Sequence, residues 1–109
     1  MLASGGVRGD YHLLTPKTIN WVTQVHSSGP DGALFGLPYQ FGLGYMVDSP
    51  MTPISLAKGR FGHSGIGGEV AFGDCKNQLG FAFLNNQQHG LLNLYQTANQ
   101  LSKALYQAL

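Results

Sequence analysis

Four glycines fall within the eight residues Phe61 to Gly68 (FGHSGIGG), and this run constrains the chain more than any other stretch. Each glycine loses backbone entropy on folding and adds no side chain for packing, so such a run is costly in an ordinary strand. It is useful where another molecule must approach the backbone closely. His63 and Ser64 add an imidazole and a hydroxyl to the run. The pattern is typical of a substrate-binding strand edge, and also of a glycine-rich turn that carries a solvated histidine.

Charged residues are scarce. They make up 10% of the 109 residues, whereas apolar residues make up 43%. Globular domains usually contain about one quarter charged residues. The apolar content predicts a globular chain with one modest core. The shortage of charge indicates that part of the surface packs against something outside these residues.

Several classes of partner are disfavoured by the composition. The net charge is only +1 and no basic run is present, so we expect no nucleic-acid partner. The apolar runs are too short to span a bilayer, so we expect no membrane insertion. The single cysteine, Cys75, cannot form an internal disulfide, which leaves the cellular compartment open. The histidines outside the glycine run lack metal-ligand spacing, so no metal site and no cofactor are expected. These are His12, His26 and His89.

Local signals predict one helix in the first third of the chain. Gly5 and Gly6 are typical of a helix end. Thr15 and Pro16 then fit the N-cap and first position of a new helix of about three turns. Its expected inward-facing residues are Ile19, Trp21, Val22 and Val25. Residues 27–38 are interpreted as a loop, and residues 41–47 as a strand whose glycines leave one face nearly bare.

The second half predicts a three-stranded antiparallel meander followed by a helix. Strands are expected at 60–65, 68–73 and 78–84, with a tight turn at 74–77. Apolar residues at three- and four-residue spacing predict an amphipathic helix over 91–109. Its expected apolar face comprises Leu91, Leu94 or Tyr95, Ala98, Leu101, Leu105 and Leu109. The fold class is therefore α+β, an antiparallel sheet packed against a long C-terminal helix.

Taken in order, these segments resemble the C-terminal part of the serine β-lactamase and penicillin-binding-protein superfamily. The likeness is closest to class C β-lactamases and their esterase and D,D-peptidase relatives. His63-Ser64-Gly65 resembles the third box of the superfamily, Lys-Thr-Gly, which is His-Thr-Gly in many relatives. Residues 41–45 (FGLGY) resemble its Gly-Leu-Gly-aromatic strand, and residues 68–72, 79–83 and 85–86 resemble the strands after the third box. The resemblance predicts a partial β-lactamase/transpeptidase-like fold, with residues 1–109 as an incomplete domain.

The resemblance also implies a chemistry for the complete domain, in which a serine forms an acyl-enzyme with an ester, peptide or β-lactam. The backbone N–H of Ile66 would be one oxyanion-hole donor, and Gly65 and Gly67 would let the acyl group lie along the backbone. Ser64 would hydrogen-bond a substrate carbonyl or carboxylate. His63 would replace the lysine beside the nucleophile. An imidazole is mostly neutral at pH 7 whereas lysine is charged, which weakens the anchoring of a penicillin-like carboxylate.

The sequence departs from the superfamily in lacking a credible nucleophile. It contains no Tyr-x-Asn and no Ser-Asp-Asn box. Its one Ser-x-x-Lys, residues 55–58, lies where the family has a connecting loop, and we interpret it as coincidental. Glu69 and Asp74 are interpreted as surface and turn residues.

Two hypotheses follow from these departures. In one, the chain is a hydrolase segment that is inactive alone, binds a small-molecule substrate only in the complete domain, and needs a missing N-terminal part or self-associates through strand 78–84. In the other, it is a non-catalytic binding module derived from the same fold.

Overall fold

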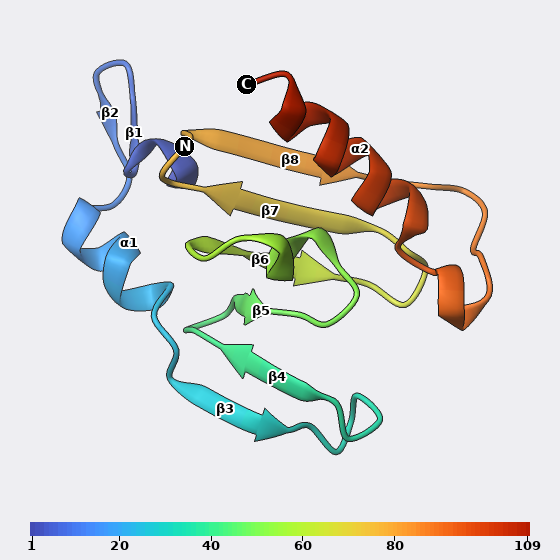
Figure 1. The fold of residues 1–109 in the computed structure, drawn as a ribbon. Coiled ribbons are helices and arrows are strands. Elements are labelled where there is room, and N and C mark those ends of the chain that lie inside the picture. The colour runs from blue at the N-terminus through green and yellow to red at the C-terminus, as the bar shows by residue number, and fades with distance from the viewer.

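The computed structural model describes all of residues 1–109 and contains a six-stranded antiparallel sheet (Figure 1). Every strand pairs with the next one along the chain, in the order β3-β4-β5-β6-β7-β8. These strands are β3 (Ser27–Pro30), β4 (Pro38–Phe41), β5 (Met46–Asp48), β6 (Arg60–Ser64), β7 (Val70–Asp74) and β8 (Leu79–Phe83). A separate hairpin is formed by β1 (Val7–Arg8) and β2 (Tyr11–His12). The helices are α1 (Pro16–Val22) and α2 (Gln96–Gln107), with short 3-10 helices η1 (Leu2–Ser4), η2 (Pro53–Leu56) and η3 (Leu91–Asn93).

The predicted fold class is confirmed, because the meander β6-β7-β8 is present and α2 packs on one face of the sheet (Figure 1). Five residue pairs join β6 to β7 and five join β7 to β8, whereas β5 meets β6 only at Met46↔Gly62. None of the helices is both long and apolar enough to cross a bilayer.

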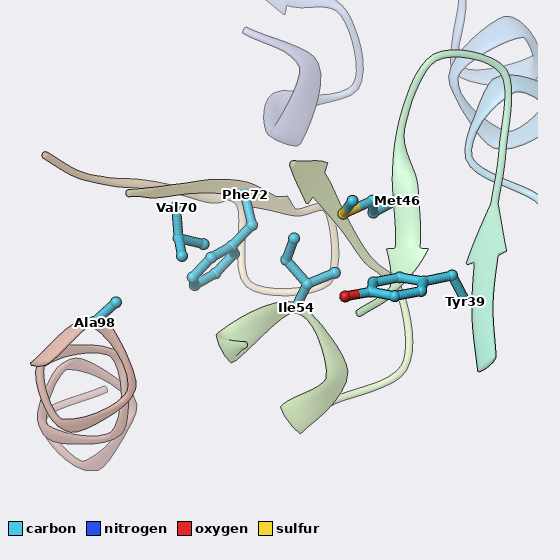
Figure 2. Close-up of a cluster of buried hydrophobic side chains, with 6 residues drawn as sticks. All are labelled: Tyr39, Met46, Ile54, Val70, Phe72 and Ala98. Atoms are coloured by element: carbon cyan, nitrogen blue, oxygen red, sulfur yellow. The ribbon is translucent and has the colours of Figure 1, made fainter. Parts of the chain in front are cut away.

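The core lies between the sheet and the two helices η2 and α2. Val70 and Phe72 of β7 point toward Ile54 of η2 and Ala98 of α2, as Figure 2 shows. Met46 and Tyr39 close the other side of Ile54 (Figure 2). Since successive strand residues point to opposite faces, the register that buries Val70 and Phe72 also decides which residues of β6 face this core.

Helix α1 begins as predicted but is shorter. The Thr15 hydroxyl accepts a hydrogen bond from the Thr18 N–H at 3.1 Å, and Pro16 is the first helical residue. The prediction of three turns is wrong, because the helix ends at Val22, where the Thr23 hydroxyl donates to the Ile19 carbonyl at 2.8 Å. Ile19 is buried, but Trp21 is 56% exposed and Val25 is also exposed.

The segment between residues 27 and 47 differs most from the prediction. Residues 27–30 form β3 instead of a loop, and the predicted strand 41–47 is divided into β4 and β5. The division occurs at Gly42, whose N–H donates to the Tyr45 carbonyl at 2.8 Å and so closes a turn. A Cβ at Gly42 would overlap the Val22 carbonyl oxygen, so the glycines of this segment serve a turn against the end of α1.

The C-terminal helix is also shorter than predicted, and only part of its predicted apolar face is buried: Leu94 and Ala98 are buried as predicted, whereas the buried Ser102 was not expected. Ala98 and Ser102 are completely buried, which lets the helix backbone approach the sheet. The prediction is wrong for Leu91, Leu101 and Leu109, which are exposed; Leu109 is 68% exposed. The small residues decide the contact because a leucine at either buried position would hold the helix away from Val70 and Phe72.

A buried polar cluster joins α2 to the sheet. The Tyr106 hydroxyl donates to the Asp74 carboxylate at 2.5 Å, and the Asn77 amide donates to it at 2.8 Å. The Arg60 guanidinium donates to the Pro53 carbonyl at 2.6 Å and lies 3.9 Å from the centre of the Tyr106 ring. Burial alone would raise the pKa of Asp74, but the hydrogen bonds from Tyr106 and Asn77 outweigh it and lower that pKa below its usual value.

This cluster makes stability depend on acid pH. Because the folded pKa of Asp74 is depressed, its contribution is present above the unfolded value of 3.8 and is lost as the pH falls through the folded pKa. We expect Tyr106→Phe to lower the free energy of unfolding at pH 7 by about 1 kcal/mol. The variant should also lose less stability on acidification, because without the Tyr106 hydrogen bond the pKa of Asp74 is lowered less. Urea unfolding between pH 2 and pH 7 measures both. An unchanged acid profile in the variant would contradict the role of Tyr106; Tyr11→Phe, in the exposed hairpin, is the control.

Candidate functional site

The loop from Gly65 to Glu69 connects β6 to β7 and contains most of the glycine run. The Gly65 N–H donates to the Glu69 carbonyl at 2.9 Å, and the Gly68 N–H donates to the Gly65 carbonyl at 3.1 Å. Gly68 has φ +99°, and a Cβ there would lie 2.6 Å from the Leu94 carbonyl oxygen. This position therefore requires glycine both for its left-handed backbone and for its contact with the chain before α2.

Three side chains from the segment after β8 hold the three consecutive carbonyls of this loop. The Tyr95 hydroxyl donates to the Gly65 carbonyl at 2.9 Å. The Gln88 amide donates to the Ile66 carbonyl at 2.8 Å, and the Asn85 amide donates to the Gly67 carbonyl at 2.9 Å. These roles were not predicted. They depend on the tertiary fold, because the donors lie 18 to 30 residues from their acceptors.

The Ile66 N–H is left free by this arrangement. It makes no hydrogen bond within the chain, and Ile66 is 61% exposed. The chain contains no cis peptide, so in the Gly65–Ile66 peptide the C=O and N–H point in opposite directions. Because Tyr95 and the Gly68 N–H fix the direction of the Gly65 carbonyl, they also fix the direction of the Ile66 N–H.

The two polar side chains of the third box lie on opposite faces of β6. Ser64 pairs with Val70 and faces the core side, where its hydroxyl lies 3.3 Å from the Ser49 hydroxyl. His63 pairs with Ala71 and faces the other side of the sheet. Its Nδ1 lies 2.9 Å from the Ser64 carbonyl oxygen and can donate to it. The imidazole is exposed and the serine is half-buried.

The glycines at positions 65 and 67 are not bare. The carboxylate of Glu69 lies over both, such that a Cβ on Gly65 would overlap one carboxylate oxygen and a Cβ on Gly67 the other. Glu69 is half-buried and forms no ion pair; the ion pair in the structure joins Arg60 to Asp74. Glu69 is therefore not a simple surface residue. Its carboxylate occupies the space beside Gly65 and Gly67 in which we expected an acyl group to lie.

The Ser-x-x-Lys sequence at 55–58 does not form a catalytic pair in this structure. Ser55 donates to the Thr52 carbonyl at 2.9 Å and makes no hydrogen bond to Lys58. Helix η2 ends at Leu56, and Ala57 has extended backbone angles (φ −156°, ψ 144°), so Lys58 lies outside the helical turn. No three His, Cys, Asp or Glu side chains come together as a metal site.

Two apolar cavities flank the third box. One, of about 610 Å³, lies on the His63 side and is lined by Tyr45, Phe61 and Ala71 among others. The other, of about 550 Å³, touches Ser64 and Ile66 and is lined mostly by apolar residues of 33–51 and 91–95. No lysine or arginine side chain lines either cavity.

Comparison with solved structures identifies this arrangement. A penicillin-binding-protein homologue from Caulobacter crescentus superposes with a TM-score of 0.86 at 30% identity, over 99% of this chain and 29% of its own. A family VIII carboxylesterase gives 0.78 at 26% identity, over 99% and 29%. The chain matches a C-terminal part of the serine β-lactamase and penicillin-binding-protein superfamily fold.

A third member, EstA from Arthrobacter nitroguajacolicus Rue61a, gives a TM-score of 0.68 at 28% identity, over 97% of this chain and 29% of its own. The chain therefore spans 29% of the length of these three structures, and it corresponds to a C-terminal part of the superfamily fold. No protein-family model and no curated protein matches it. The partial β-lactamase-like fold predicted from the sequence is confirmed.

The Tyr95 hydrogen bond can be tested in this chain directly. Tyr95→Phe removes the donor to the Gly65 carbonyl and should cost the loop about 1 kcal/mol, equivalent to about fivefold faster amide exchange at Gly65 and Gly68. Amides of the β6–β7 pairing should exchange at their original rates. Hydrogen exchange followed by NMR measures both. Equal acceleration across the whole sheet would contradict a local role for Tyr95, and Tyr11→Phe is the matched control.

Proposed function

We propose that residues 1–109 are the C-terminal segment of a β-lactamase-like serine hydrolase that cleaves an ester, peptide or β-lactam through an acyl-enzyme. In this proposal the chain is an incomplete domain and is inactive alone. It supplies the third box, His63-Ser64-Gly65, and one oxyanion-hole donor, the N–H of Ile66. The nucleophilic serine and its base belong to a part of the protein that precedes these residues.

The observation that carries the proposal is the free, oriented N–H of Ile66. Acyl transfer places negative charge on the carbonyl oxygen of the substrate, and donors that are already aimed at that oxygen stabilise the transition state. The Ile66 N–H lies on a loop that Tyr95, Gln88 and Asn85 hold in place, which supports this role. One similar structure is a family VIII carboxylesterase and another is a penicillin-binding-protein homologue, which supports the same class of reaction.

The proposal assigns the following steps to this chain. The serine of the missing part attacks the substrate carbonyl carbon, and the carbonyl oxygen becomes the oxyanion that the Ile66 N–H stabilises. Ser64 donates to a second polar group of the substrate, and His63 donates to or accepts from groups beside the nucleophile. The leaving group takes a proton and departs, and water then hydrolyses the acyl-enzyme.

The proposed partner is the missing N-terminal part. Strand β8 is an edge of the sheet, with Phe81 and Phe83 half-buried beside its unpaired backbone groups. On the face opposite α2, β7 and β8 present small residues such as Ala71, Gly73 and Ala82, which line the 610 Å³ cavity together with Phe61. An additional strand at β8 and a segment packed on this face would cover both surfaces.

Activity is the direct test of the proposal. We expect purified 1–109 to remain unlabelled by a fluorophosphonate probe, and to form a labelled complex when produced with the segment encoded upstream of Met1. In that complex, His63→Ala should lower kcat/KM for a p-nitrophenyl ester by about 10²–10³ with little change in stability. His12→Ala, in the exposed hairpin, is the control. Stoichiometric labelling of Ser55 in 1–109 alone would overturn the proposal.

Association provides an independent test. An exposed, uncharged strand edge is a template for pairing, and each Å² of exposed apolar surface is unfavourable by about 25 cal/mol. We therefore expect isolated 1–109 to be marginally stable and to self-associate, and to become monodisperse with the upstream segment. Size-exclusion chromatography with light scattering and a thermal melt measure this. A monomer with a sharp cooperative melt at micromolar concentration would favour the non-catalytic binding module instead.

A further inference from the structure

One ring nitrogen of His63 is already engaged within the chain, and this decides what the other nitrogen can do. Nδ1 lies 2.9 Å from the backbone oxygen of Ser64. A carbonyl oxygen only accepts hydrogen bonds, so Nδ1 carries the proton. In a neutral imidazole the second nitrogen, Nε2, is then an acceptor without a proton. Because the two nitrogens lie on opposite sides of the ring, Nε2 points away from the Ser64 carbonyl, and it makes no hydrogen bond within the chain.

No charged group of the chain holds this imidazole in its cationic form. His63 lines the 610 Å³ cavity, which Tyr45 and the amino group of Met1 also face, and a hollow of about 240 Å³, which Glu69 faces. Glu69 forms no ion pair with the ring. On the core side of β6, the ionisable side chains of the 550 Å³ cavity are Asp31, Tyr39 and Tyr95. Imidazoles without a carboxylate against them are mostly neutral at pH 7.5, so Nε2 keeps its lone pair.

The free nitrogen lies where the missing part is expected to pack. His63 is exposed on the face of the sheet opposite α2, and the proposed function assigns that face to the N-terminal part. No lysine or arginine of this chain lines the cavity or the hollow beside the ring. A donor for Nε2 therefore has to come from outside residues 1–109.

We propose that His63 serves the site as a hydrogen-bond acceptor, through Nε2, for an O–H or N–H donor of the missing N-terminal part. This inference rests on the proposed function, in which His63 either donates or accepts, and it selects one of these roles. A lysine in the same place would supply the opposite chemistry, because an ammonium group only donates. The histidine is thus not a weaker substitute for lysine: it needs a donor where lysine needs an acceptor.

Four substitutions separate the two roles in the complex of 1–109 with its upstream segment. Glutamine offers a carbonyl acceptor near the position of Nε2. Asparagine keeps only the donor near Nδ1, lysine offers only donors, and alanine offers neither. At pH 7.5 with a p-nitrophenyl ester, we expect kcat/KM to fall by less than about tenfold in His63→Gln. It should fall by about 10²–10³ in His63→Asn, His63→Lys and His63→Ala.

Two outcomes of this series would overturn the acceptor role. One is a His63→Lys complex as active as the native complex, because lysine cannot accept. The other is an equal loss in all four variants, because an acceptor near Nε2 would then make no difference. Thermal melts of the complexes show whether the variants fold. His12→Lys introduces the same charge in the exposed hairpin and should leave kcat/KM unchanged.

The position of the ring proton can be observed in the native complex without any substitution. Long-range ¹H–¹⁵N correlation spectra distinguish the neutral forms of each histidine, because a ring nitrogen without a proton resonates far downfield of one that carries it. We expect His63 to carry its proton on Nδ1. His26 is the internal control: its Nε2 lies 2.8 Å from the Trp21 carbonyl oxygen, so its proton should be on Nε2. A proton on Nε2 of His63, or on both of its nitrogens at pH 7.5, would overturn the proposal.

These outcomes are distinguishable from failure of the proposed function. A complex that never forms an acyl-enzyme, yet holds the His63 proton on Nδ1, would refute the hydrolase and keep His63 as an acceptor. An active complex in which His63→Lys matches the native chain would keep the hydrolase and refute this inference.

Discussion

Five consecutive residue pairs join β6 to β7, from Arg60↔Asp74 to Ser64↔Val70, and nearly every other feature of the chain depends on that register. It buries Val70 and Phe72 under α2 and leaves His63 on the opposite face. A slip of one residue would reverse both assignments. The same register brings Arg60 beside Asp74, which in turn holds Tyr106 of α2. The third box is thus positioned by the pairing that forms the core.

Sequence reasoning succeeded where a local signal determines local structure. The Thr15–Pro16 helix start and the strands β6, β7 and β8 were predicted because capping and alternation act over a few residues. It failed for β3, because Ser27–Pro30 has the composition of a turn and becomes a strand only through its pairing with β4. On α2 it found the buried Ala98 but missed Ser102, which is buried because it is small although it is polar.

The site was predictable in part for the same reason. His63-Ser64-Gly65 and Ile66 were identified from a short pattern, and their proposed roles await the experiments above. The side chains that hold the loop of the third box could not be predicted from a short pattern. Asn85, Gln88 and Tyr95 act on carbonyl oxygens, which every residue has, so no residue type at the acceptor positions marks the contact. Glu69 was interpreted as a surface residue because no residue type in the sequence marks a carboxylate that lies over two glycines.

The strand order of the sheet is the same as the order of the strands along the chain. Each strand therefore pairs with a strand that is near it in the sequence, and each pairing closes only a short loop. Additions from outside can then occur only at the two ends of the row, at β3 or at β8. A segment with this topology can be added to, or removed from, a larger protein without any change in the order or pairing of its own strands.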